Sequence, residues 1–169
     1  MLARVRIRML LLAGLAIGAV TGLPAGNIPA HAKVVTETCR PITPQQVAAL
    51  FDRWNASLAK TPDAVILNYS TDAVLLPTKE NGPLIGRQEI RGYFVHFLAS
   101  HPTGVIDQRI IKIGCNMAFD VGLYTFTVDG SQPGSRTQIA ARYTFIYEPR
   151  GAQWLIVHHH SSALPVPPK

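Results

Sequence analysis

Apolar residues in the first half of the sequence recur at the spacing of a helix. One set, at positions i, i+3, i+4, i+7 and i+11, consists of Val47, Leu50, Phe51, Trp54 and Leu58. A second set, downstream of Gly86, consists of Ile90, Tyr93, Phe94, Phe97 and Leu98. Each set predicts an amphipathic helix that buries one face.

Capping signals mark the starts of two helices. Thr43, followed by Pro44 and Gln46, has the order of a capping box with proline at the first helical position. Residues 61–63, Thr-Pro-Asp, repeat this start signal. We therefore expect a second, shorter helix that includes Tyr69.

The second half of the sequence is typical of β-strands. Four long runs are rich in Val, Ile, Thr, Tyr and Phe: residues 105–115, 117–129, 136–148 and 153–162. Short turn signals separate these runs, which indicates an antiparallel meander, and two short strands are expected earlier, within residues 73–85. Helices followed by such strands predict an α+β fold, in which about three helices cover a cone-shaped, strongly curved antiparallel sheet. If the other face of this sheet is apolar too, it requires a second subunit.

The sequence begins with the features of a secretory signal peptide. Arg4, Arg6 and Arg8 form a basic start, residues 9–20 form an apolar run, and residues 30–32, Ala-His-Ala, match a cleavage site. We expect cleavage after residue 32 and export to the periplasm or the medium, without membrane attachment afterwards. An uncleaved membrane anchor is the alternative.

The expected mature chain is one domain. Residues 33–42 form a lead, residues 43–163 the folded domain, and residues 164–169 a proline-rich tail. The formal net charge of the whole chain is +6, and removal of the signal peptide takes away three basic residues and no acidic ones. The remaining charge gives no reason to expect nucleic acid as a partner.

The two cysteines of the chain, Cys39 and Cys115, are far apart in the sequence. An exported protein with two distant cysteines most simply carries one disulfide. The chain-entropy model assigns roughly 4 kcal/mol to closing a loop of this length. Two free thiols or a metal pair are the alternative.

The last predicted strand ends in three consecutive histidines. Strict alternation along a strand would place Trp154, His158 and His160 on one face, and His159 with Ser161 on the other. We expect the second set to face a ligand pocket and the first set to face a partner copy of the chain. His158 and His160 would suit a metal ion, but no spacing indicates a third ligand, so neither a metal nor a cofactor is predicted.

Arg142, Tyr124 and Tyr143 are further candidates for the wall of a small-molecule pocket. An arginine there would give bidentate hydrogen bonds to an acidic or hydroxylated ligand. Surface cations and tyrosines at the edge of the core are the alternative. Asp107 and Asp120 would be possible general bases if they faced the pocket, although an exposed position at the sheet edge is the more ordinary expectation.

The order of elements resembles the nuclear-transport-factor-2-like, or SnoaL-like, superfamily, whose fold is a cone with a pocket. Residues 154–160, residues 84–86 (Leu-Ile-Gly) and the pair Tyr93-Phe94 narrow the resemblance to the association (hub) domain of calcium/calmodulin-dependent protein kinase II, and especially to its exported bacterial branch, the SgcJ/EcaC type. The resemblance covers residues 45–162. It implies self-association as a homodimer or a larger assembly, and it implies no agreed reaction.

Residues that give the relatives their chemistry are not matched. The kinase hub has an arginine after its His-x-His, where this chain has Ser161, and two more pocket arginines of the hub fall at Thr125 and Phe145. Ketosteroid isomerases, in the same superfamily, use a tyrosine and a carboxylate where this chain has Trp54 and Pro77. The resemblance therefore implies neither the anion-binding pocket of the hub nor the isomerase mechanism.

Two functions remain open from the sequence. The first is a self-associating module that binds a small molecule. The alternative is an enzyme, such as an isomerase, a cyclase or an oxidoreductase-like protein, that acts on a small hydrophobic substrate in the pocket. His159, Arg142 or an aspartate would supply its acid or base.

Overall fold

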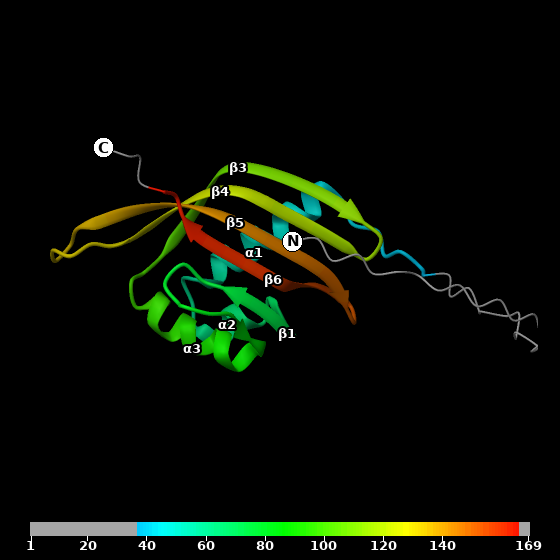
Figure 1. Ribbon diagram of the computed structural model, residues 1–169, viewed down its shortest axis with the longest axis horizontal. Coiled ribbons are helices and arrows are strands. Elements are labelled where there is room, and N and C mark those ends of the chain that lie inside the picture. Colours follow the sequence, from blue (N-terminus) through cyan, green and yellow to red (C-terminus); the bar gives the residue numbers. More distant parts are fainter. Residues whose placement is uncertain (1–36, 166–169) are drawn as a thin grey trace, which may run out of the picture. The chain divides into compact units, whose positions relative to one another are not determined.

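The computed structural model describes residues 37–165, which fall within one compact unit, Glu37–Lys169 (Figure 1). The predicted signal peptide and the last residues of the predicted tail lie outside the described residues. A search of the described part of the chain finds no helix that is both long enough and apolar enough to cross a membrane.

Three helices form close to the predicted positions: α1 (Pro44–Ser57), α2 (Pro62–Ile66) and α3 (Gly86–Leu98). The capping box before α1 is present. The Thr43 hydroxyl accepts a hydrogen bond from the Gln46 amide at 3.2 Å, and the Gln46 side chain accepts one from the Thr43 amide at 2.8 Å. The Thr61 hydroxyl caps α2 by accepting a hydrogen bond from the Ala64 amide at 3.2 Å.

Six strands form one sheet in the order β2-β1-β6-β5-β4-β3. Their bounds are β1 (Tyr69–Leu76), β2 (Leu84–Ile85), β3 (Thr103–Gly114), β4 (Met117–Asp129), β5 (Arg136–Arg150) and β6 (Gln153–Ala163). The meander from β3 to β6 is antiparallel, as expected. β1, however, pairs with β6 in parallel, so the sheet is mixed, because the chain crosses through α3 and the meander before it returns beside β1.

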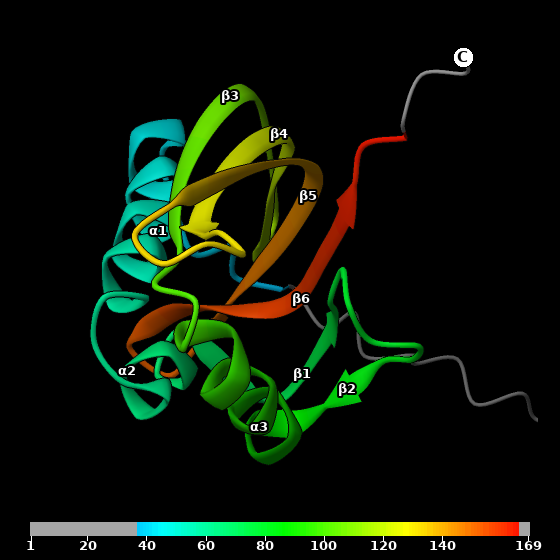
Figure 2. The ribbon, with the colours of Figure 1, turned by 90° about the vertical axis from the view of Figure 1, so that its left-hand side faces the viewer.

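The sheet curves strongly, and the helices lie on its concave side (Figure 2). The core fills this concavity. Its largest fully buried side chains are Trp54, Tyr69, Tyr124, Tyr147, Phe94 and Phe145. The architecture is the predicted α+β cone, with the helices closing its mouth.

Tyr69 was expected in the second helix and instead begins β1. The helix ends at Ile66, and Tyr69 then pairs with Ile156 of β6. Its side chain is fully buried, with a hydroxyl that hydrogen-bonds inside the cone. The helical assignment was wrong because the apolar spacing of so short a segment fits either structure.

Strict alternation along β6 was also a wrong expectation. Ile156 pairs with Tyr147 and His158 pairs with the preceding Ile146, so Val157 is an extra residue, a β-bulge. The bulge puts Trp154 on the concave side, within the core cluster and 8% exposed. Trp154 thus lies on the face opposite His158, contrary to the prediction that the two share a face.

A second bulge lies in β3, at Asp107. It brings the β3 backbone so close to Gly122 of β4 that a Cβ atom there would lie 2.0 Å from the carbonyl oxygen of Gln108. Only glycine fits this crossing without a backbone shift. The glycine therefore helps to set the curvature of the sheet on which the concave side chains stand.

The first described residues, from Glu37 to Ile42, are attached to the end of the sheet that carries the β3–β4 and β5–β6 turns. Cys39 and Cys115 are joined in a disulfide, in agreement with the expected pairing. Arg40 adds hydrogen bonds from its guanidinium to the carbonyl groups of Gly151 and Ala152, at 2.5 and 2.6 Å. The lead thus links the β3–β4 turn to the β5–β6 turn.

Candidate functional site

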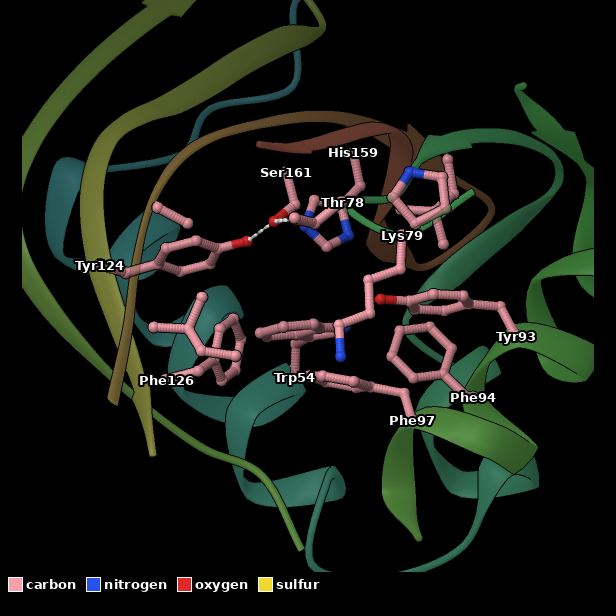
Figure 3. Close-up of a pocket in the computed structure, with 14 residues that line it drawn as sticks. Trp54, Thr78, Lys79, Tyr93, Phe94, Phe97, Tyr124, Phe126, His159 and Ser161 are labelled. Atoms are coloured by element: carbon pink, nitrogen blue, oxygen red, sulfur yellow. Dashed lines mark hydrogen bonds between the residues drawn. The ribbon is translucent and has the colours of Figure 1, made fainter. Parts of the chain in front are cut away.

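The concave side holds a cavity between α1, α3 and the sheet (Figure 3). Its volume, about 50 Å³ for the centres of water molecules, has room for a few waters or one small molecule. The walls are mostly apolar. The lining residues are Trp54, Leu75, Pro77, Thr78, Lys79, Tyr93, Phe94, Phe97, Tyr124, Phe126, Ile139, Ala141, His159 and Ser161.

His159 of β6 is the buried polar side chain at the base of this cavity, and it is 3% exposed. Its ring stacks on Phe145, with the ring centroids 4.1 Å apart, and meets Trp54 edge to face at 5.3 Å. Burial, followed by the charges of the neighbouring His158 and His160, lowers the pKa of His159 to about 3. The imidazole is therefore neutral at physiological pH.

Tyr69 and Trp54 hold this imidazole in place. The Tyr69 hydroxyl lies 2.8 Å from Nδ1 of His159, and Nε1 of Trp54 donates to the same hydroxyl at 3.0 Å. Burial raises the pKa of Tyr69 well above its usual value, so its hydroxyl stays protonated. Nε2 of His159, by contrast, is buried without a hydrogen-bond partner within residues 37–165.

A chain of three hydroxyl groups runs beside the imidazole (Figure 3). Tyr124 donates to Oγ of Ser161 at 2.6 Å, and Ser161 lies 2.7 Å from Oγ1 of Thr78. Burial raises the pKa of Tyr124, which keeps its proton on the phenol. The three hydroxyl groups largely satisfy one another's hydrogen-bonding capacity. Because they lie together, they form one polar edge of the cavity.

Lys79 and Tyr93 lie at the mouth of the cavity, where Lys79 is exposed. The lysine side chain crosses in front of the aromatic wall formed by α3 (Figure 3). Burial raises the pKa of Tyr93 to about 12. A single flexible cation therefore stands at the entrance and none stands among the other lining side chains.

Of the five residues predicted for the pocket, three line this cavity: His159, Ser161 and Tyr124. Tyr143 faces the same side of the sheet but lies outside the lining, where its hydroxyl donates to Asp120 at 2.8 Å. Arg142 is exposed on the opposite face and donates to the carbonyl of Ala163 at 3.3 Å. The structure therefore places Arg142 away from the cavity, because it alternates with two inward-facing neighbours on β5.

Asp120 was expected at an exposed edge, and this was wrong: it is fully buried on the concave side. Arg109 Nε lies 3.1 Å from its carboxylate, and Tyr143 donates to it. Burial is the largest effect on the pKa of Asp120 and raises it. Asp107 is exposed and accepts a hydrogen bond from Thr125. Neither carboxylate lines the cavity.

His158 and His160 lie half-buried on the convex face of the sheet. His158 stands beside Ile146, which in turn pairs with Phe119, and His160 is beside Thr144. No group of three or more His, Cys, Asp or Glu side chains in the described ranges is placed to hold a metal ion.

Three residues of the site were not predicted from the sequence: Tyr69, Thr78 and Lys79. Tyr69 was assigned to a helix, and its partnership with His159 depends on the parallel pairing of β1 with β6, which links opposite ends of the domain. Thr78 and Lys79 lie in the loop that follows β1, after Pro77. A loop after a strand at the cone mouth was a usable signal, because such loops carry ligand contacts in many folds.

Comparisons with known proteins agree with the fold. A family model described as the calcium/calmodulin dependent protein kinase II association domain matches residues 43–165. A crystal structure from Xanthomonas campestris, described as a candidate association domain of the same kind, is 43% identical with a TM-score of 0.68, and the match covers 78% of this chain and 99% of that one. The comparison with curated proteins found no match.

More distant structures share the fold alone. A nuclear transport factor 2-like superfamily protein from Salmonella enterica is 18% identical, with a TM-score of 0.64 over 73% of this chain and 92% of that chain. A ketosteroid isomerase-like protein from Erwinia carotovora atroseptica is 16% identical, with a TM-score of 0.59 over 71% and 95%. The fold is thus nuclear-transport-factor-2-like, and the chain belongs to the calcium/calmodulin dependent protein kinase II association-domain family.

Proposed function

We propose that this protein is an exported, self-associating module that binds a small, largely apolar molecule in the cavity of the cone. The lining of the cavity is the observation that supports ligand binding. Aromatic side chains from α1, α3 and β4 surround it, and its few polar groups converge at one end, around His159 and Ser161. This combination is typical of small-molecule sites.

The convex face of the sheet supports self-association. Apolar side chains from three strands lie in neighbouring rows on it: Ile110, Phe119, Val121, Leu123 and Ile146. Ile110 is 58% exposed, and the helices lie on the other side of the sheet (Figure 2). A second copy of the chain, placed face to face by a two-fold axis, would bury this surface together with His158 and His160.

Export is supported by the disulfide between Cys39 and Cys115, since such bonds persist in oxidising compartments. The basic and apolar start of the sequence, which lies outside the described residues, agrees with that route.

The enzyme hypothesis has less support from the cavity. No carboxylate is among the residues that line it, and its histidine is held neutral by burial. A general acid or base works best with a pKa near the operating pH, which His159 does not have. Binding is therefore the function that the geometry favours.

A cavity-filling substitution tests the ligand-binding part. Ala141 lines the cavity and is 2% exposed, whereas its neighbour Ala140 points to the opposite side and is exposed. We expect Ala141→Leu to abolish binding of small aromatic fragments, measured by ligand-observed NMR, because the added side chain occupies their space. Ala140→Leu is the matched control and should bind as the unmodified protein does. Equal binding by both variants would show that the fragments bind outside the cavity.

A further inference from the structure

The hydrogen bonds around Tyr69 fix the direction of each proton. Nε1 of Trp54 carries a hydrogen and has no acceptor capacity, so it donates to the Tyr69 hydroxyl. The hydroxyl keeps its own proton and needs an acceptor. The remaining partner of this hydroxyl in the described part of the chain is Nδ1 of His159, 2.8 Å away. Tyr69 therefore donates to Nδ1.

This direction settles the tautomer of His159. A neutral imidazole carries one hydrogen, and since Nδ1 accepts, the hydrogen resides on Nε2. His159 lines the cavity, its Nε2–H group is buried, and none of the residues from 37 to 165 accepts a hydrogen bond from this group. Buried donors in folded proteins nearly always have a partner, so this one requires an explanation.

We propose that the Nε2–H group of His159 is the recognition donor of the cavity, and that the ligand is a small aromatic molecule with a neutral oxygen acceptor, such as a carbonyl group. The inference rests on the proposed ligand-binding function and names the class of its ligand. Tyr69 acts in it as a positioning residue, because it contacts His159 and is not among the residues that line the cavity.

The aromatic part of the ligand follows from the walls. Trp54, Phe94, Phe97 and Phe126 present ring faces and edges to the space, as Figure 3 shows. The cavity is small, about 50 Å³ for the centres of water molecules, which favours a single substituted ring. A polycyclic molecule would need the walls to move.

The neutrality of the acceptor follows from the charges. The deep end offers one neutral donor and no cation, and Lys79 stands at the exposed mouth. A carboxylate bound at His159 would lose its hydration without an opposite charge to replace it. A cationic group is disfavoured too, because the Nε2–H dipole presents its positive end to the cavity.

Calorimetric titration of the purified, oxidised protein with four single-ring probes of similar size tests the proposal: acetophenone, ethylbenzene, benzoate and benzylamine. We expect acetophenone to bind about ten-fold more tightly than ethylbenzene, which has the same ring and two-carbon chain but no acceptor oxygen. Benzoate and benzylamine should bind more weakly than acetophenone. Equal binding of acetophenone and ethylbenzene would overturn the donor role and leave the ligand-binding function standing, whereas binding of none of the four would count against that function itself.

The Tyr69→Phe variant tests the positioning role. Without the hydroxyl, Nδ1 of His159 loses its donor, and we expect the preference for acetophenone over ethylbenzene to fall several-fold. Histidine 15N NMR on the unmodified protein provides a readout that does not depend on the variant folding. It should show His159 protonated at Nε2 alone. Protonation at Nδ1 would overturn the proposal.

Discussion

The neutral state of His159 makes a specific prediction about stability and pH. Its pKa in the folded chain is lowered to about 3 by burial, whereas a histidine in an unfolded chain titrates near 6.5. Between these values the unfolded chain binds a proton that the folded chain does not. Stability is therefore intact above about pH 6.5 and is lost progressively as the pH falls towards 3.

The magnitude follows from the two pKa values. From pH 7 to pH 5 an unfolded histidine becomes almost fully protonated, while His159 in the folded chain does not. The linkage relation then gives a loss of about 2 kcal/mol in the free energy of unfolding from this one group. The His159→Gln variant has no group that titrates at this position, so its loss over the same pH interval should be smaller by that amount.

Urea denaturation at pH 7 and pH 5, followed by tryptophan fluorescence, measures the difference. His96→Gln is the matched control, because it makes the same substitution at an exposed position of α3. Other titrating groups, including His158, are present in all three proteins and cancel in the comparison. Equal losses in the unmodified protein and His159→Gln would refute the reasoning that the buried imidazole is neutral.

Two further predictions concern the sheet. Val121→Glu puts a charge in the middle of the convex apolar face and should convert the assembly to monomers in analytical ultracentrifugation. Val95→Glu, at an exposed apolar position of α3, is the control and should leave the assembly intact. Dissociation by both variants would point to a different interface. Gly122→Ala should lower the free energy of unfolding by about 1–3 kcal/mol, because its Cβ would collide with the β3 backbone. Gly92→Ala, where nothing lies within 4 Å, should be neutral or stabilising in the same denaturation assay, and an unchanged stability of Gly122→Ala would contradict the close crossing.

Local signals in the sequence were sufficient for most of the elements. The capping box at Thr43 and the apolar spacing of α1 and α3 depend on neighbours within a few residues, and the structure confirms them. The four long strands were recognisable from composition and from the turns between them. These features need no knowledge of distant parts of the chain.

The wrong predictions concern features that depend on contacts between residues far apart in the sequence. The bulge at Val157 depends on how β6 meets β5, and it reversed the side on which Trp154 was expected. The burial of Asp120 depends on Arg109 and Tyr143, which lie on two other strands. The partnership of His159 with Tyr69 needs the parallel β1–β6 pair. A sequence pattern of period two contains none of this information.

Light scattering on the purified, oxidised protein at micromolar concentration tests self-association, to which both the family and the apolar convex face point. Self-association predicts a monodisperse particle with the mass of at least two chains. A monodisperse particle with the mass of one chain would contradict it.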